Sequence, residues 1–222
     1  LFSYFLCTIY FRDIAWLRKV ILLLASWLFY AWWDARFLPL LICSILVNWL
    51  VSRLFIHFKI RKTVTFGIAF NLFLIGYFKY KNFFIENMSV FLDFEPSSNA
   101  IVLPIGISFF TFQQIAYLVD LKKKRAPLYG LLDYSVFISF FPQLIAGPIV
   151  RHSEFMPQLM KSPLRDGLSE RLSRGLTLLT IGLAKKIIFA DTLGKHANSV
   201  FDIAKSMPPS LSESWSGTIA FS

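Results

Sequence analysis

Long stretches of this chain carry no charged side chain, and short clusters of charged and polar residues separate them. A helix needs roughly 20 apolar residues to cross a bilayer, and the longest stretch comes close to that length. The uncharged stretches are residues 20–33, 37–52, 63–78, 101–119 and 134–150. The pattern predicts an all-α fold, a polytopic transmembrane helical bundle with crossings at about 20–35, 37–56, 63–78 and 101–121.

The composition favours a membrane protein over a soluble one. Of the 222 residues, 56% are hydrophobic and 18% are aromatic, and the mean hydropathy of +0.59 is high for a soluble domain. The net charge of +10 would suggest nucleic acid in a soluble protein. Basic loops at a membrane face explain it better here, so we expect the lipid bilayer, and no nucleic acid, as a partner.

Basic residues between the predicted crossings give them an orientation. Consecutive crossings alternate sides, which places ten basic residues on one side and three on the other. The ten are Arg12, Arg18, Lys19, Lys59, Arg61, Lys62, Lys122, Lys123, Lys124 and Arg125, and the three are Arg36, Lys79 and Lys81. Cytoplasmic loops are rich in Lys and Arg, so the side with ten is cytoplasmic. Residues 82–100 then form a short amphipathic segment and a loop outside.

The stretch FPQLIAGPIVRHSEF, residues 141–155, interrupts its own helix. Pro142 cannot donate a backbone hydrogen bond, and Gly147-Pro148 breaks the helix again. Freed backbone groups are costly in hydrocarbon, so protein must shield this segment or it must border a wet cavity. Residues 126–150 either dip into the membrane and return, a re-entrant element that the basic residues after Val150 favour, or cross fully against the charge rule.

Residues 165–190 predict an amphipathic helix at the cytoplasmic face. An apolar stripe recurs there at helical spacing, and basic residues flank it. The stripe consists of Leu168, Leu172, Leu176, Leu179, Leu183 and Ile187, and the basic residues are Arg171, Arg174, Lys185 and Lys186. The second half of this helix is expected to enter the membrane, with its two lysines reaching back to the surface.

Polar side chains inside the predicted crossings are candidates for function, because their burial in lipid is costly. Ser44, Asn48 and Ser52 repeat every four residues and share one face of a helix. Small polar groups on one face favour packing against a neighbouring helix.

A second polar group lies further along the chain. Ser108, Thr111 and Gln114 share part of one helix face and, with Gln113, either line a polar tunnel or pack against another helix. Gln143 lies between the two helix breaks, where it either caps freed carbonyl groups or faces the same tunnel.

The three histidines are far apart in the sequence and meet no metal-ligand spacing. His57 and His196 are expected to be solvated. His152 stands beside Arg151 and near Glu154 just after the break, but we assign it no catalytic role. The residues alone assemble no Ser-His-Asp or Cys-His site, and the two cysteines lie in apolar segments without a disulfide or metal pattern.

Three segments, in this order and spacing, resemble the membrane-bound O-acyltransferase family: LLLASWLFYAWWDARFLPLLICSILVNWL, LPIGISFFTFQQIAYLVDLKKKRAP and FISFFPQLIAGPIVRHSEFMPQL. The sequence is most similar to the bacterial alginate O-acetyltransferase branch, which also resembles the D-alanyl transferase of teichoic acid modification. The likeness covers nearly the whole chain. It implies a single membrane domain over residues 1–222, the N-terminal part of the family's transmembrane core. Because both ends fall in apolar runs, we expect this sequence to be cut at both ends.

The resemblance implies a transfer reaction at the bacterial cytoplasmic (inner) membrane by a multi-pass protein. In the family an acyl group, acetyl in this branch, passes from a cytoplasmic donor such as an acyl thioester to a hydroxyl group outside the membrane, usually on an exported polysaccharide. The expected partners are the donor or its carrier on the cytoplasmic side, and a polysaccharide or a periplasmic acetyl-transfer partner. No tightly bound cofactor is expected.

The resemblance also implies a tunnel with a histidine at its thin centre as general base. The tunnel-lining candidates are Gln113, Gln114, Pro142, Gln143, Gly147, Pro148 and Arg151. The family's catalytic histidine follows a tryptophan further along the chain, and this sequence contains no Trp-His pair. We therefore assign no catalytic residue within 1–222, expect that histidine beyond residue 222, and expect this sequence alone to be inactive.

A transporter or flippase for a precursor of a cell-envelope polymer is the alternative, because such proteins also contain broken helices and intramembrane polar groups. They typically carry inverted repeats, and none is visible here. A purely structural membrane protein would not need the break. A Trp-His pair in the continuing chain would favour the acyltransferase, and a second broken helix resembling residues 101–150 would favour the transporter.

Overall fold

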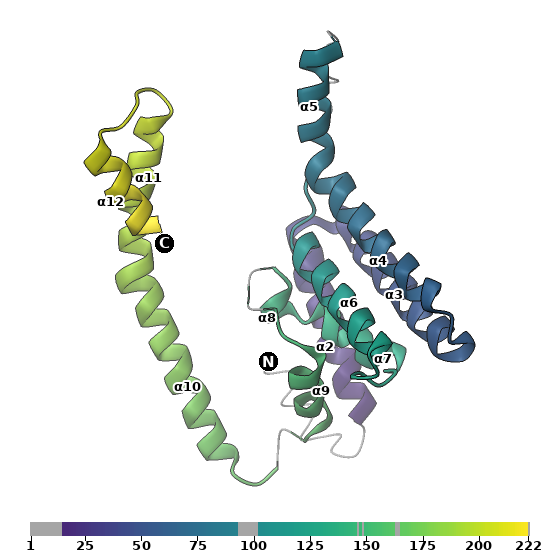
Figure 1. Cartoon of the computed structure of the whole chain (residues 1–222). Coiled ribbons are helices and arrows are strands. Elements are labelled where there is room, and N and C mark those ends of the chain that lie inside the picture. Colours follow the sequence, from purple (N-terminus) through teal and green to yellow (C-terminus); the bar gives the residue numbers. More distant parts are fainter. Residues whose placement is uncertain (1–14, 93–101, 146, 148, 163–164, 222) are drawn as a thin grey trace. The chain divides into compact units, whose positions relative to one another are not determined.

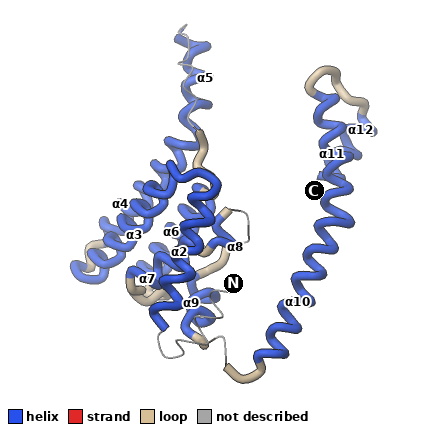
Figure 2. Tube along the Cα trace, turned by 180° about the vertical axis from the view of Figure 1, so that it is seen from behind, coloured by secondary structure: helices blue, strands red, loops and turns tan. Residues whose placement is uncertain are grey.

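A computed structural model of the chain describes residues 15–221 with the exception of 93–101, 146, 148 and 163–164. This described part is helical, and no strand occurs in it (Figures 1 and 2). Contacts divide the chain into two compact units, Leu1–Ser162 and Pro163–Ser222. The predicted all-α fold is therefore confirmed, whereas the single membrane domain stays a prediction.

The first unit is built from helices that pack around α6 and α7. Its elements are α2 (Ala15–Asp34), η1 (Ala35–Phe37), α3 (Leu38–Phe58), α4 (Arg61–Ile75), η2 (Gly76–Tyr80), α5 (Lys81–Leu92), α6 (Ile107–Lys122), α7 (Leu131–Ser139), α8 (Phe141–Leu144) and α9 (His152–Met160). The turn η2 is π-helical and continues α4 directly into α5. In Figure 1, α3 and α4 run side by side in opposite directions, and both also contact α6.

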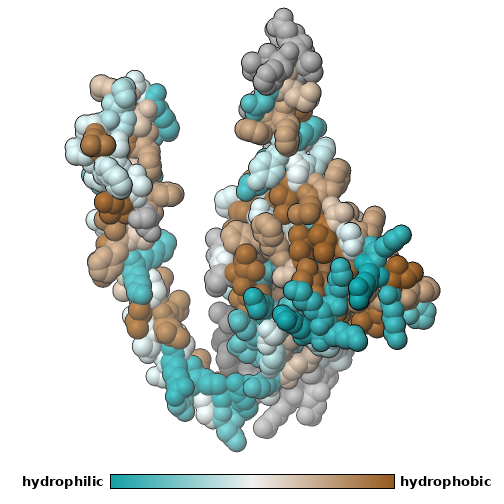
Figure 3. Space-filling view, in the orientation of Figure 1, coloured by the Kyte–Doolittle hydropathy of each residue, from teal (hydrophilic) through white to brown (hydrophobic). Residues whose placement is uncertain are grey.

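Two helical stretches of the described chain, Trp16–Phe58 and Arg61–Ile85, are long and apolar enough to cross a membrane. They contain the first three predicted crossings. Figure 3 shows hydrophobic side chains over much of the visible face of the first unit, and hydrophilic ones near the junction of α3 and α4. By length and composition, these stretches agree with the first three predicted crossings.

The helix of the fourth predicted crossing is shorter than the sequence suggested. We expected it from residue 101, but α6 begins at Ile107 and has 16 residues, a length of about 24 Å. Pro104 and Gly106 precede its first turn, and Gly106 has a φ of +73°, which a helix does not allow. In the described residues, the uncharged run is therefore part non-helical chain and part helix.

A cluster of large buried side chains forms the core of the first unit. Tyr30, Tyr117 and Tyr134 are each at most 1% exposed. The Tyr30 hydroxyl donates to the carbonyl of Ile105 at 3.1 Å, which ties α2 to the extended chain before α6. Close packing of these large rings against one another holds together the helices that surround the broken element.

A buried network of amide and hydroxyl groups joins α3, α4 and α6. Ser44 and Asn48 of α3 donate to Gln114 Oε1 of α6, and Asn71 of α4 exchanges hydrogen bonds with Asn48. These side chains are all completely buried. The interpretation of the face containing Ser44, Asn48 and Ser52 as a helix-packing surface is confirmed.

We expect Asn48→Ala to lower the free energy of unfolding by about 2 kcal/mol, because the buried amides of Gln114 and Asn71 would each lose one interhelical hydrogen bond. Thermal unfolding of the protein in detergent measures the change. The control is Asn87→Ala, since the exposed Asn87 amide donates to the carbonyl of Phe83 in its own helix. Equal losses for the two variants would contradict an interhelical role for Asn48.

The predicted helix break is present in the structure. α7 ends at Ser139, Phe140 turns the chain with a ψ of 109°, and α8 adds four residues before helical geometry is lost. All residues from Tyr134 to Ser139 are buried, so protein shields this helix on every side, as the sequence required. At nine residues, about 14 Å, α7 is too short to cross a bilayer. The re-entrant path of residues 126–150 stays a prediction.

Two contacts hold the broken element in place. Buried Gln143 donates from Nε2 to the carbonyl of Phe137 at 2.9 Å, a carbonyl near the end of α7 that lacks a helical partner. Of the two roles predicted for Gln143, the capping of a freed carbonyl is therefore confirmed. On the opposite side, Gly106 lies so close to Leu144 that a Cβ at this glycine would overlap the Leu144 carbonyl oxygen.

The second unit consists of a long helical segment and a hairpin. Its elements are α10 (Leu168–Ala184), η3 (Lys185–Ala190), α11 (Asp191–Ala204) and α12 (Leu211–Phe221). The helix predicted over residues 165–190 thus begins at Leu168, and its place at the membrane stays a prediction. Ser210 and Glu213 form a capping box at the start of α12, with the Glu213 carboxylate accepting from the Ser210 backbone N–H. Gly217 of α12 packs directly on Val200 of α11.

Candidate functional site

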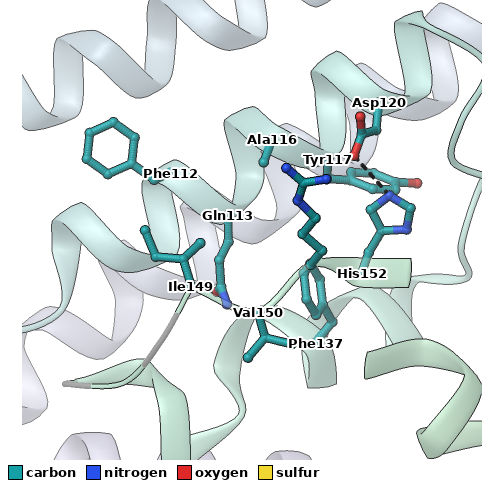
Figure 4. A pocket seen from close by; sticks show the side chains of 10 residues that line it. Phe112, Gln113, Ala116, Tyr117, Asp120, Phe137, Ile149, Val150 and His152 are labelled. Carbon is teal, nitrogen blue, oxygen red and sulfur yellow. Dashed lines mark hydrogen bonds and ion pairs between the residues drawn. The ribbon is translucent and has the colours of Figure 1, made fainter. Parts of the chain in front are cut away.

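One face of α6 forms a wall of a cleft of about 530 Å³ (Figure 4). The residues of this wall are Phe112, Gln113, Ala116, Tyr117 and Asp120. Their spacing of one, three or four residues places all of them on the same side of the helix. The wall extends for about 12 Å, since each helical residue rises by 1.5 Å.

The opposite wall comes from the broken element. Phe137 of α7 and His152, the first residue of α9, contribute to it, together with Ile149, Val150 and Arg151 between the helices. A continuous helix would turn about one residue in three or four toward α6. Consecutive residues line the cleft here because the chain has no helical structure before α9. The break therefore shapes this wall.

The neighbouring residues Gln113 and Gln114 of α6 lie on different faces of the helix. Gln113 lines the cleft, whereas Gln114 is buried in the amide network with α3 and α4. One residue turns an α-helix by about 100°, which places Gln114 outside the arc of the helix that carries the cleft wall. The helix thus carries a packing face and a cleft face side by side.

His152 is buried, and both of its ring nitrogens have partners. Nε2 lies 3.3 Å from the Asp120 carboxylate, the contact that is dashed in Figure 4, and Nδ1 lies 3.1 Å from the Tyr129 hydroxyl. The ring also meets Tyr117 edge-on, with 5.7 Å between the ring centroids. His152 therefore joins α9 to α6 and to the loop between α6 and α7.

The Asp120 carboxylate sets the direction of these hydrogen bonds. A carboxylate only accepts, so the Nε2–H of His152 donates to Asp120. In a neutral imidazole the other ring nitrogen is an acceptor, so Nδ1 accepts from the Tyr129 hydroxyl. A single tautomer thus satisfies all three side chains.

The structure brings two of the predicted tunnel-lining residues together. Gln113 and Arg151 lie on opposite walls of the cleft, and Arg151 is exposed. Gln114 and Gln143 lie elsewhere: Gln114 faces α3, and Gln143 donates to the carbonyl of Phe137.

The remaining candidates lie around α8. Pro142 is exposed and is not part of the lining formed by the described residues. Gly147 is half-buried against α8, where its Cβ position is 3.1 Å from Gln143 Cα. Pro148 lies outside the described residues. A continuous tunnel through the protein stays a prediction.

Sequence reasoning missed Tyr117 and Asp120 and gave His152 no role. Gln113, Tyr117 and Asp120 follow one another at i, i+4 and i+7, so the sequence did contain a signal that they share a face. Nothing comparable exists for His152, because it reaches Asp120 only through the tertiary fold. Both histidines predicted to be solvated, His57 and His196, are exposed.

The cleft combines charged and polar groups with mainly apolar walls. Arg151 supplies a positive charge, and basic residues 122–125 follow the Asp120 end of α6 and are exposed. Such a field attracts anionic molecules. Among the described residues, no three His, Cys, Asp or Glu side chains are grouped as a metal site would need.

Comparison with known proteins identifies relatives over nearly the whole chain. A model of the membrane-bound O-acyltransferase (MBOAT) family matches residues 5–222. A peptidoglycan O-acetyltransferase of Helicobacter pylori is 38% identical over 239 residues, covering 92% of this chain and 44% of the relative. A probable alginate O-acetylase, AlgI, of Azotobacter vinelandii is 31% identical over 223 residues, covering 96% of this chain and 44% of the relative.

A more distant likeness joins this chain to a teichoic acid D-alanyltransferase of Bacillus subtilis. The two are 32% identical over 96 residues, which is 41% of this chain and 24% of the relative. No solved structure matches the chain. The chain spans less than half the length of these relatives, so it corresponds to one part of their architecture.

Proposed function

Because the chain belongs to the membrane-bound O-acyltransferase family, we propose that the protein moves an acyl group, most simply acetyl, from a cytoplasmic donor to a hydroxyl group of an exported polysaccharide. The family match over residues 5–222 is the observation that carries this proposal. The relatives named for peptidoglycan and alginate suggest a cell-envelope polymer as acceptor. The proposed location is the bacterial inner membrane, which the protein crosses several times.

The cleft between α6 and the broken element is the proposed entry for the donor. The Asp120 end of α6 leads into basic residues 122–125, the most basic stretch on the side that the loop charges assign to the cytoplasm. An acyl thioester on an anionic carrier would approach this face, and Arg151 would meet its charge. Residues 1–222 then supply the donor side of the site, and the general base is a histidine from outside this sequence.

A cellular assay distinguishes this function from the transporter alternative. The gene is deleted and the full-length protein is restored from a plasmid, and envelope polysaccharide is measured as sugar and as acetate released by mild base. An acyltransferase predicts that deletion removes the acetate and leaves the sugar content unchanged. Loss of exported sugar together with its acetate would favour the flippase instead.

We expect Arg151→Glu in the full-length protein to raise the KM for the anionic donor about tenfold or more, because it replaces an attractive charge in the cleft with a repulsive one. Initial rates in inside-out membrane vesicles measure it. Lys79→Glu, the same charge reversal on the predicted outer side, is the control and should leave KM unchanged. An unchanged KM for Arg151→Glu, and for reversal of residues 122–125, would contradict the proposed donor entry.

A further inference from the structure

The cleft wall formed by Ile149, Val150 and Arg151 lacks the internal hydrogen bonds of a helix. The position of a segment without such bonds depends on the contacts of the residues that flank it. On one side the anchor is Gln143, through its bond to α7. On the other side the first buried polar group after the wall is His152.

We propose that His152 is a positioning residue, whose hydrogen bonds to Asp120 and Tyr129 hold Arg151 and the neighbouring wall in place at the cleft. Arg151 and the start of α9 form one rigid piece, because the Arg151 carbonyl accepts from the backbone N–H of Glu154 and of Phe155 at 3.0 and 3.2 Å. A displacement of the His152 ring therefore displaces Arg151 with it.

The partners of His152 belong to a firm frame. The Tyr129 carbonyl accepts from the indole N–H of Trp49 in α3 at 3.2 Å, and the Tyr129 backbone N–H donates to the Tyr117 hydroxyl of α6 at 3.3 Å. Asp120 lies within α6 itself. The two bonds of His152 thus fasten α9 to α6 directly and to α3 through Tyr129.

Apolar packing alone would not fix this geometry. Phe155 and Met156 hold α9 against the core, but hydrophobic contact has no preferred direction. A ring with a donor on one edge and an acceptor on the other sets both the orientation and the distance of the start of α9. His152 supplies these two bonds while remaining 4% exposed.

Enzyme kinetics of the full-length protein test the positioning role of His152, and this experiment rests on the proposed function. His152→Phe keeps a ring against Tyr117 and removes both nitrogens, and we expect it to raise the donor KM about tenfold with kcat within threefold. His152→Gln keeps a donor and an acceptor and should restore KM to within threefold. In an Arg151→Gln background, His152→Phe should add little, since both changes act through the same guanidinium. His57→Phe, the same change at an exposed histidine, is the control.

A second measurement needs no activity. Val150→Cys is introduced into a full-length protein whose native cysteines are replaced by serine, and labelling by a membrane-impermeant maleimide is followed in inside-out vesicles. We expect His152→Phe to change the labelling rate at least threefold, and His152→Gln to leave it near the parent value. Unchanged labelling in His152→Phe overturns the proposal even if KM rises. If the parent protein transfers no acyl group, the proposed function fails and labelling still decides the role of His152.

Discussion

Gly106→Ala is expected to lower the free energy of unfolding by about 3 kcal/mol, the largest loss of stability that we predict for a single added methyl group. Two costs combine at this position. The φ of +73° disfavours every L-residue with a Cβ, and the added carbon would overlap the carbonyl oxygen of Leu144. Since that oxygen belongs to the backbone of α8, no side-chain rotation relieves the overlap.

Thermal unfolding of the purified protein in detergent measures the loss. The matched control is Gly76→Ala, because a Cβ at Gly76 meets no atom within 4 Å and its φ of −55° is helical. The control should be unchanged or slightly more stable, since alanine favours helices. Equal stability of the two variants would show that α8 does not press against the start of α6.

The contact at Gly106 also links stability to the cleft. Gly106 directly precedes α6, and Leu144 ends α8, so this contact sets the distance between the start of α6 and the broken element. Only glycine combines this backbone turn with so close an approach. A substitution here is therefore expected to lower activity as well as stability, whereas Asn48→Ala acts on the face of α6 that packs against α3 and α4.

The sequence predicted the elements of the first unit more accurately than their partners. Apolar runs bounded by charge located α2, α3 and α4, and prolines and glycine located the break, because these signals are local. The late start of α6 at Ile107 was missed, since an uncharged run does not distinguish extended chain from helix. The capping by Gln143 remained one of two alternatives, because its partner, the Phe137 carbonyl, becomes available only in the folded chain.

The cleft could not be predicted from the sequence, because its walls come from segments that are distant in the chain. Gln113 and Arg151 were both candidates, but their place on opposite walls follows from the packing of α7 and α9 around α6. His152 lies 32 residues after Asp120, and no periodicity connects positions on either side of a break. A buried polar pair of this kind is recognised from its hydrogen bonds, and these exist only in three dimensions.

We expect Gly147→Leu in the full-length protein to reduce acyl transfer more than a hundredfold while membrane insertion stays intact. A Cβ at Gly147 would lie 3.1 Å from Gln143 Cα and 3.3 Å from the Pro142 carbonyl oxygen, both backbone atoms of α8. The rest of the leucine side chain has to displace the chain that leads to Ile149 and Arg151. Misplacement of a binding group by about 1 Å is enough to lower a rate by two orders of magnitude.

Acetate released from polysaccharide measures the activity, and the amount of protein in washed membranes measures insertion. Gly76→Leu is the matched control, because it adds the same side chain where the described structure leaves open space, and it should retain transfer. Gly147→Ala should fall between the two, since one carbon requires the backbone of α8 to give way by a few tenths of an ångström. Normal transfer by Gly147→Leu would contradict a role for the broken element as a wall of the donor site. It would show that activity survives a displacement of the chain beside α8.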